Sequence, residues 1–186
     1  MGNGIAQVAA TAGYDVVMRD IEREYVDRGL ANIDSSLDRL AAKDALAAEP
    51  ATIRERITGT TDLADLADAD VVVEAAVEEM GVKRDVFAEL DAITDDDVVL
   101  ATNTSTLSVT EIASATDRAA RVVGLHFMNP VPVMDGVEVV VGERTAPAVV
   151  EVAHAFAAAP ETETGEADDK PGFVTNRILM PGSNEG

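Results

Sequence analysis

The 186-residue sequence contains no cysteine, which excludes disulfide bonds and thiolate sites. Aromatic residues make up only 3% of the chain, so a core must be built from valine, alanine, leucine and isoleucine. No apolar run approaches the roughly 20 residues of a membrane-spanning helix, and no signal-peptide pattern precedes the first motif. The sequence therefore predicts a cytoplasmic protein that does not bind a membrane.

Lysine is also scarce. Only Lys43, Lys83 and Lys170 occur among 14 basic residues, against 35 acidic ones, and the net charge is −21. Such a surface repels nucleic acid and anionic membranes. It is typical either of an acidic surface that binds a partner or of a halophilic protein whose self-repulsion is screened by salt. Because the acids are dispersed along the chain, we favour the halophilic interpretation, which predicts unfolding at low salt.

Hydrophobic periodicity predicts strands that alternate with helices. The strands are 15–19, 69–75, 98–103, 121–127 and 137–142, and the helices are 3–13, 22–48, 52–57, 78–93, 106–115 and 146–159. Consecutive β-branched residues in 69–75 are typical of a strand buried on both faces. The acidic stretch 160–170 is predicted to be a loop, and 171–180 a possible helix. The alternation with short connections predicts an α/β fold with a mainly parallel sheet.

The first 20 residues, MGNGIAQVAATAGYDVVMRD, match the second half of a dinucleotide-binding motif. The Rossmann fingerprint places G-x-G-x-x-G between the first strand and first helix, with an acid about 20 residues further on for the ribose hydroxyls. Gly2 fits the last glycine and Asp20 fits the acid, which favours NAD over NADP. The first strand and two glycines have no counterpart in the sequence, and an ordinary helix start followed by a strand-end aspartate fits the same residues.

His126 and Glu138 have the residue types of a base and its orienting partner. Oxidation of a secondary alcohol needs a base for the hydroxyl proton, and histidine is the side chain that changes charge near neutral pH. His126 ends a predicted buried strand, at the carboxyl edge where α/β sheets bind ligands. Glu138 lies in the next predicted strand, near enough to orient the imidazole. A hydrogen-bonded core histidine is the alternative, and we assign that structural role to His154, which lies mid-helix among alanines.

Four segments in this order carry a family resemblance: VVVEAAVEEMGVK, ATNTSTLSVTEIA, GLHFMNPVPVMDGVEVV and PGFVTNRILMP. Together they resemble the L-3-hydroxyacyl-CoA dehydrogenase family, which includes 3-hydroxybutyryl-CoA dehydrogenases. The resemblance runs from residue 1 to about 159 and resumes at 170. Its most specific part is H-F-x-N-P-V-P-x-M with a glutamate that follows the histidine by 12 residues.

The resemblance implies roles for individual residues. His126 would be the general acid/base with Glu138 as its partner, Ser105 would hydrogen-bond the reacting oxygen and approach the cofactor, and Asn176 would contact the substrate. The cofactor contacts that it implies are Gly2, Asp20, Glu78, Lys83, Ser105 and Asn129. Ser36 and Lys43, on the long predicted helix, would contact coenzyme A, although a solvated helix face fits those two residues equally well.

By the same resemblance, residues 1–168 form a Rossmann NAD-binding domain that lacks its first strand. Residues 169–186 would begin a helical domain through which members of the family form homodimers. In the Rossmann strand order 3-2-1-4-5-6 the first strand is central, so we expect an interruption between strands two and four. Residues 160–169 replace a strand that is hydrophobic in the family. We therefore expect a family member shortened at both ends, with Met1 as an internal methionine of the motif.

The predicted function is the NAD-dependent oxidation of an L-3-hydroxyacyl-CoA to a 3-oxoacyl-CoA, in fatty acid β-oxidation or its reverse. The expected partner is the acyl-CoA substrate, without nucleic acid and without a metal site. Two alternatives remain open. One is a non-catalytic remnant of the family, and the other is a related sugar-acid dehydrogenase.

Overall fold

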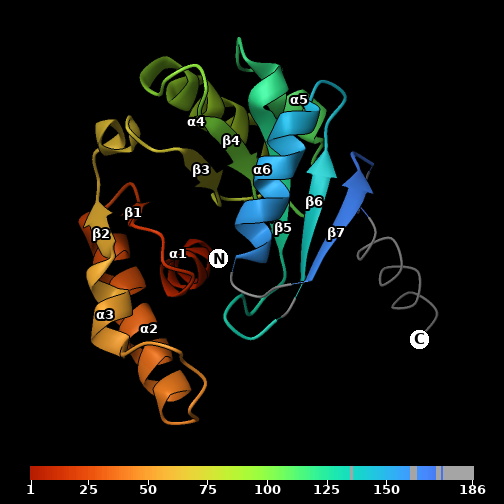
Figure 1. Cartoon of the computed structure of the whole chain (residues 1–186). Coiled ribbons are helices and arrows are strands. Elements are labelled where there is room, and N and C mark those ends of the chain that lie inside the picture. Colours follow the sequence, from red (N-terminus) through yellow and green to blue (C-terminus); the bar gives the residue numbers. More distant parts are fainter. Residues whose placement is uncertain (135, 160–162, 171–172, 174–186) are drawn as a thin grey trace, which may run out of the picture. The chain divides into compact units, whose positions relative to one another are not determined.

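The computed structural model describes the chain except for residues 135, 160–162, 171–172 and 174–186. The chain divides into two compact units, whose elements are labelled in Figure 1. The first unit comprises Met1–Leu66, Met128–Asp135 and Ala159–Glu161, and the second comprises Ala67–Phe127, Gly136–Ala158 and Thr162–Gly186.

The first unit is built from a pair of parallel strands and the helices that pack on them. Its elements are α1 (Gly2–Thr11), β1 (Val16–Arg19), α2 (Arg23–Ala41), α3 (Pro50–Glu55), β2 (Ile57–Thr60) and the 3-10 helix η1 (Leu63–Leu66). β1 pairs with β2 in the register Val16 to Ile57. Ile33 and Leu37 of α2 form the core with Ala6, Ala10, Ile53 and Ile57. Ile33 and Leu37, one helical turn apart, therefore lie on the buried face of α2.

The segment that follows β5 packs against the start of α1 within the first unit. A Cβ atom placed on Gly4 would lie 3.0 Å from the Cβ of Val131, and Val131 is buried. A larger residue at position 4 would push the two segments apart. The backbone N–H groups of Val133 and Met134 both donate to the carbonyl of Pro130, which closes the segment into a turn. This packing holds residues 129–134 at the N-terminal turn of α1.

The second unit contains a five-stranded sheet in the order β3-β4-β5-β6-β7. The strands are β3 (Val71–Glu74), β4 (Val99–Thr102), β5 (Val122–Phe127), β6 (Gly136–Val141) and β7 (Glu163–Asp168). Its helices are α4 (Met80–Ile93), α5 (Val109–Ala113), η2 (Ala119–Arg121) and α6 (Pro147–Ala158). Only the β5–β6 pair is antiparallel. β4 and β5 are buried along their whole length, which agrees with their continuous apolar sequence.

The predicted α/β class and mainly parallel sheet are confirmed. The strands fall into two sheets, β1-β2 and β3 to β7, and within the described ranges no strand joins them. None of the described helices is both long and apolar enough to cross a bilayer.

The prediction of a loop over 160–170 is wrong, because this stretch contains β7. The strand pairs in parallel with β6 along its length, from Gly136 opposite Glu163 to Val141 opposite Asp168. Ala167 is the buried residue on its inner face. Among the described residues β7 pairs only with β6, and Gly165, Glu166 and Asp168 are exposed, so the strand shows little apolar pattern. Hydrophobicity alone therefore failed to reveal it.

Other boundaries also differ from the prediction. The long helix expected to reach position 48 ends at Ala41, and the chain then turns through Asp44 at φ 53, a conformation that aspartate tolerates better than most residues. β2, which is short and contains a glycine, was not predicted. β3 is half-buried along its valines rather than buried on both faces, because it ends its sheet. α5 is shorter than the predicted helix 106–115.

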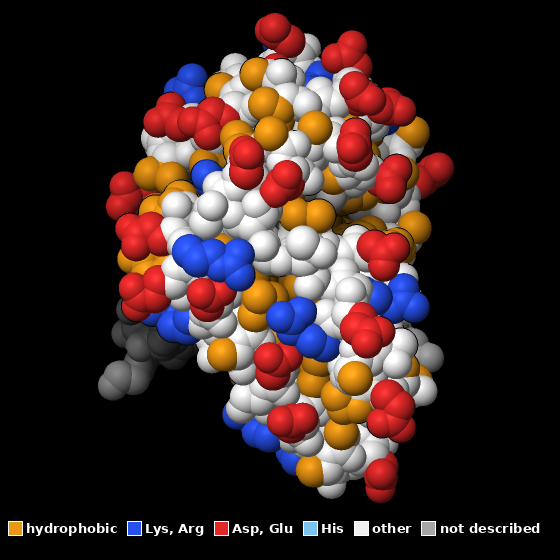
Figure 2. Space-filling model, turned by 90° about the vertical axis from the view of Figure 1, so that its left-hand side faces the viewer, with side chains coloured by type: hydrophobic (Ala, Val, Ile, Leu, Met, Phe, Trp, Pro, Cys, Tyr) orange, Lys and Arg blue, Asp and Glu red, His pale blue; other side chains and the backbone are white. Residues whose placement is uncertain are grey.

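The surface carries the dispersed acidic charge seen in the sequence. Figure 2 shows aspartate and glutamate side chains scattered over the visible face, with lysines and arginines between them rather than in a separate basic patch. Hydrophobic side chains lie among them in small groups. The visible face therefore has the mixed, mainly acidic character that the sequence composition predicts.

Candidate active site

His126 and Glu138 lie directly opposite each other on the antiparallel strands β5 and β6. Opposite residues of an antiparallel pair point to the same face of the sheet, and here the imidazole Nδ1 lies 2.7 Å from the carboxylate Oε2 of Glu138. The two residues are 6% and 7% exposed. The structure therefore brings together the base and the orienting acid that the sequence suggested.

The direction of this contact decides which imidazole nitrogen is available. An ionised carboxylate only accepts hydrogen bonds, so Nδ1 of His126 is the donor and Nε2 carries the lone pair. Among the described residues, none makes a hydrogen bond to Nε2. The arrangement leaves Nε2 as the nitrogen that can take a proton from a bound molecule.

Phe173 packs beside the imidazole. The two ring centroids are 5.8 Å apart with the rings tilted by 58°, and Phe173 is 2% exposed. Its backbone has φ 45, which is unusual for a bulky residue, and its N–H donates to the carbonyl of Lys170. Phe173 thus forms an apolar wall on one side of His126. Phe173 was predicted only as part of a possible helix over 171–180, whose other residues lie outside the described ones.

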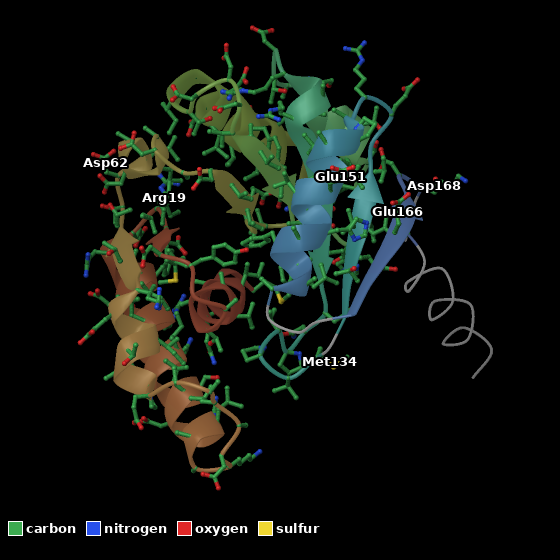
Figure 3. All side chains as sticks on the ribbon, viewed as in Figure 1. Arg19, Asp62, Met134, Glu151, Glu166 and Asp168 are labelled. Carbon is green, nitrogen blue, oxygen red and sulfur yellow. The ribbon has the colours of Figure 1, made fainter. Side chains whose placement is uncertain are left out.

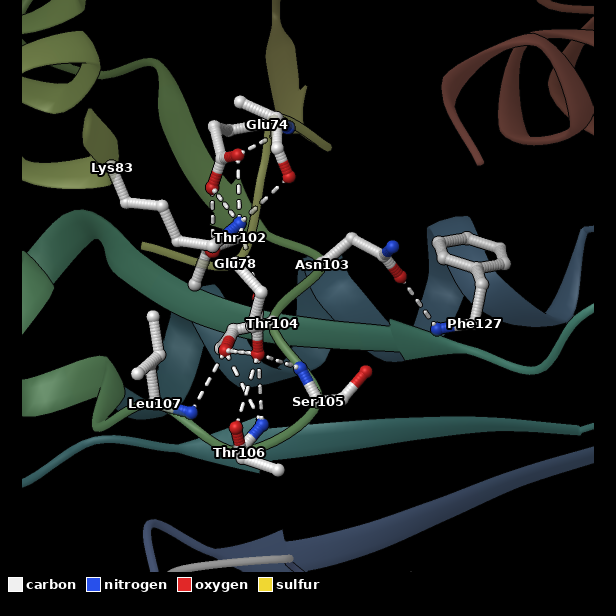
Figure 4. Close-up of polar contacts among 11 residues, drawn as sticks. Glu74, Glu78, Lys83, Thr102, Asn103, Thr104, Ser105, Thr106, Leu107 and Phe127 are labelled. Carbon is white, nitrogen blue, oxygen red and sulfur yellow. Dashed lines mark hydrogen bonds and ion pairs between the residues drawn. The ribbon is translucent and has the colours of Figure 1, made fainter. Parts of the chain in front are cut away.

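Asn103 fixes the end of the strand that carries His126. It follows β4 and is buried, and its Oδ1 accepts the backbone N–H of Phe127 at 2.9 Å, as Figure 4 shows. Without Asn103, the backbone N–H of Phe127 would lose this acceptor, and a buried backbone N–H without an acceptor is costly. Asn103 was not predicted as a functional residue, although it is the last residue of the predicted strand 98–103 and stands two positions before Ser105.

Ser105 lies in the turn between β4 and α5, and Glu78 binds that turn. The Oε1 atom of Glu78 accepts the backbone N–H of Ser105 at 2.7 Å and the hydroxyl of Thr104 at 2.6 Å (Figure 4). It also accepts the N–H and hydroxyl of Thr106 at 3.1 and 3.3 Å. Partial burial by itself would raise the pKa of the Glu78 carboxyl, but these donors and the Lys83 ammonium together lower it below its usual value.

Lys83 is enclosed by the second unit. Its Nζ lies 2.9 and 3.1 Å from the two carboxylate oxygens of Glu74 and 3.5 Å from Oε2 of Glu78. The side chain of Lys83 is 0% exposed and that of Glu74 is 2% exposed. The hydroxyl of Thr102 donates to the Glu74 carboxylate at 2.7 Å. The backbone N–H of Ala76 donates to the same carboxylate at 2.5 Å. The ion pair therefore joins β3, β4 and α4. Glu74 was not predicted. The sequence feature that could have indicated the ion pair is an acid at the end of an apolar strand followed nine residues later by a lysine.

Asp169 holds the start of α5. Its carboxylate accepts the backbone N–H groups of Val109 and Thr110 at 2.9 and 2.7 Å, and the hydroxyl of Ser108 at 2.9 Å. A carboxylate at a helix N-terminus satisfies donors that have no partner within the helix. The residue that follows β7 thereby fixes the helix that follows the Ser105 turn. Nothing in the local sequence pairs position 169 with position 109.

The remaining predicted residues belong to the first unit. Gly2 is the first residue of α1. Asp20 follows β1, and its Oδ1 accepts the N–H of Ile21 at 2.8 Å. Asn129 is exposed and precedes Pro130 in a cis peptide. Ser36 lies half-buried on α2, whereas Lys43 lies exposed in the turn beyond it. The expectation that Lys43 stands on the long helix is therefore wrong, because α2 ends earlier.

The predicted residues thus fall into separate groups. The second unit brings His126 to Glu138, and Ser105 to Glu78 and Lys83. Asn176 lies outside the described residues. Among the described residues no group of three or more histidine, aspartate or glutamate side chains is arranged to hold a metal ion.

Comparison with known proteins places the chain among dehydrogenases. The family model for the 3-hydroxyacyl-CoA dehydrogenase NAD-binding domain matches residues 1–164. A probable 3-hydroxybutyryl-CoA dehydrogenase of Deinococcus radiodurans is 47% identical over the whole chain and 66% of its own length. The 3-hydroxybutyryl-CoA dehydrogenase of Bradyrhizobium diazoefficiens is 44% identical over the whole chain and 64% of its length.

The fold agrees with a solved relative. The crystal structure of (S)-3-hydroxybutyryl-CoA dehydrogenase from Ralstonia eutropha is 42% identical, with a TM-score of 0.96 over 100% of this chain and 66% of that one. The chain therefore spans about two thirds of the length of these relatives. Since the matched part of the family is its NAD-binding domain, the prediction of NAD as the cofactor is confirmed.

Proposed function

The chain belongs to the 3-hydroxyacyl-CoA dehydrogenase family, and from this premise we propose that it catalyses the NAD-dependent oxidation of an L-3-hydroxyacyl-CoA or the reverse reduction. The names of its relatives favour 3-hydroxybutyryl-CoA as the substrate. The observation that supports the proposal most directly is the 2.7 Å contact between Nδ1 of His126 and the Glu138 carboxylate.

In the proposed reaction, Nε2 of His126 takes the proton of the substrate 3-hydroxyl as the neighbouring C–H gives up a hydride. Glu138 keeps the imidazole in the tautomer with a free Nε2 and stabilises the imidazolium that forms. Phe173 covers one side of the ring, which limits the positions that the imidazole can adopt. In the reverse direction His126 returns the proton to the oxygen. We place Ser105 at the substrate oxygen, and Asn176 beside it on the strength of the family resemblance.

The first unit carries residues that fit the ends of NAD. α1 begins at Gly2, and the N-terminus of a helix offers backbone N–H groups to a pyrophosphate. Gly4 allows close packing at this turn, which fixes the segment that contains Asn129. Asp20 follows β1 and has the carboxylate that binds ribose hydroxyls in such sites. When bound, NAD supplies the acceptor for the hydride. We keep Ser36 and Lys43 as proposed contacts of coenzyme A.

The experiment that tests the proposal compares the two histidines of the chain. In the purified protein, His126→Gln should lower the rate of acetoacetyl-CoA reduction, followed by the loss of NADH absorbance, by about 10²- to 10⁴-fold. NADH should raise the unfolding temperature of this variant as much as that of the wild type, because a ligand that binds the native state stabilises it. The control His154→Gln should retain wild-type turnover, since His154 contacts Thr164 and Glu166 instead.

Each outcome bears on the proposal. Near-normal turnover of His126→Gln would remove His126 as the base. A wild-type protein that NADH does not stabilise and that reduces no acyl-CoA would match a non-catalytic remnant. Oxidation of a sugar acid without any turnover of acyl-CoA would identify the other dehydrogenase class. Location in the cytoplasm is inferred from the sequence pattern, and assembly into a homodimer through the helical domain is inferred from the family resemblance.

A further inference from the structure

Glu78 gathers the donors of a turn that is distant in the sequence. The residues whose groups donate to it, Thr104, Ser105 and Thr106, lie 26 to 28 positions further along the chain. Glu78 itself stands just before α4, on the connection from β3. Figure 4 shows these bonds converging on one carboxylate oxygen. A side chain from one loop therefore sets the backbone conformation of the loop that contains Ser105.

Lys83 accounts for the other carboxylate oxygen. Its ammonium faces Oε2 of Glu78 at 3.5 Å while it is held by both oxygens of Glu74. Because the Lys83 side chain is 0% exposed, it presents no surface to a bound molecule. Its contact with Glu78 orients the carboxylate so that Oε1 points to the Ser105 turn. In this structure Lys83 reaches the Ser105 turn through Glu78, and the contact with the cofactor that the family resemblance implies stays a prediction.

We propose that Glu78 is a positioning residue, held by the buried Glu74–Lys83 pair, that fixes Ser105 for the reaction. This inference rests on the proposed function, because Ser105 is placed at the substrate oxygen. Four donor groups meet at Oε1, and an ionised oxygen attracts them more strongly than the neutral oxygen of an amide. A glutamine at this position would also turn its NH₂ group toward the Lys83 ammonium, so it would lose the contact that orients the side chain.

The matched variants are Glu78→Gln and its neighbour Glu79→Gln. Both remove one negative charge at the start of α4, but Glu79 is exposed and, among the described residues, its side chain makes no hydrogen bond. In the full chain, Glu78→Gln should speed hydrogen exchange of the Ser105 and Thr106 amides by about 10- to 100-fold, as expected for the loss of bonds to a charged group. It should lower kcat for acetoacetyl-CoA by a similar factor, with the Kd for NADH within about twofold.

The conservative variant Glu78→Asp should restore part of kcat and of the amide protection, because it keeps the charge. Glu79→Gln should match the wild type in both. Loss of NADH affinity with unchanged kcat in Glu78→Gln would overturn the proposal and make Glu78 a cofactor contact. Unchanged exchange at Ser105 and Thr106 would overturn it as well.

A titration of the wild type tests the same contact even if a variant does not fold. The amide proton resonances of Ser105 and Thr106 should shift together as acid protonates Glu78, with a midpoint below the usual glutamate pKa. Shifts with an ordinary glutamate midpoint, or none, would contradict the proposal. If the wild type reduces no acyl-CoA, the proposed function fails, whereas the titration and the exchange measurements still decide whether Glu78 holds the turn.

Discussion

Two buried contacts between a basic and an acidic side chain in the second unit differ in how many of their polar atoms have partners. Glu74 and Lys83 connect β3 with α4, whereas His126 and Glu138 connect β5 with β6. The nitrogen–oxygen distances are 2.9 and 2.7 Å. The Lys83 ammonium has further acceptors in Ala76 and Glu78. Among the described residues, His126 uses only Nδ1 in a hydrogen bond. The Lys83 ammonium is thus surrounded by acceptors from the protein, whereas Nε2 of His126 has no hydrogen-bond partner among the described residues.

This difference separates a structural pair from the pair that we propose to be reactive. Glu74 also accepts from the hydroxyl of Thr102 and the N–H of Ala76, so a change in either partner disturbs two strands and a helix. The open nitrogen of His126 can exchange a proton without any such disturbance. A buried charge is therefore indicative of catalysis only where one of its polar atoms stays available.

The largest effect is expected from Lys83→Met, which leaves the Glu74 carboxylate buried without its cation. Removing one partner of a buried ion pair costs about 3–5 kcal/mol. The free energy of unfolding, measured by urea denaturation, should therefore fall by about this amount. The double variant Glu74→Gln, Lys83→Met should recover much of the loss, because neither charge remains.

Arg84→Met is the control for this change, since Arg84 is the exposed neighbour on α4. It should shift the free energy of unfolding by no more than about 0.5 kcal/mol. Equal effects of the two substitutions would mean that the pair is not the structural element that the comparison requires.

A smaller effect on stability is expected from Glu138→Gln. The amide oxygen can still accept the Nδ1–H of His126, so the free energy of unfolding should change by less than about 1.5 kcal/mol. Turnover should nevertheless fall by about 10²- to 10⁴-fold, because the imidazolium loses its counter-charge. Urea unfolding and NADH-coupled kinetics on the same preparation would measure both. A large loss of stability with retained turnover would reverse the contrast between the two pairs.

The smallest effect is expected from His154→Gln. His154 of α6 also faces a glutamate, Glu166 of β7, but at 3.6 Å and with side chains 31% and 63% exposed. Surface pairs of this kind contribute about 0–1 kcal/mol. The free energy of unfolding should therefore change by less than about 1 kcal/mol, as measured in urea at pH 6. A loss as large as that of Lys83→Met would show that burial does not explain the difference between the pairs.

The sequence predicted the elements that have a strong apolar pattern and the residues that stand at their ends. β4 and β5 were predicted as strands at nearly their observed bounds and are fully buried, whereas the strand 69–75, predicted to be buried on both faces, is only half-buried along its valines. The neighbourhood of His126 and Glu138 followed from their positions in consecutive strands. Asp169 and Phe173 could not be found in this way, because their contacts join segments far apart in the chain and depend on tertiary packing that no local pattern encodes.

The network around Glu78 was only half visible in the sequence. The family resemblance implies that Glu78 and Lys83 contact the cofactor, which stays a prediction, but no sequence pattern indicated their contacts with Ser105 and Glu74. The halophilic interpretation stays a prediction. Acidic side chains are scattered over the visible face of the protein (Figure 2). Unfolding at low salt remains the test of the halophilic interpretation.

The acidic composition of β7 has a consequence for self-association. Glu166 and Asp168 lie along this strand and are exposed (Figure 3), and among the described residues β7 is the last strand of its sheet. The outer edge of a sheet can pair with another chain and begin aggregation, and charged side chains on that edge oppose such pairing. The residues that hid the strand from a hydrophobicity pattern are thus residues that protect its edge from a second copy of the protein.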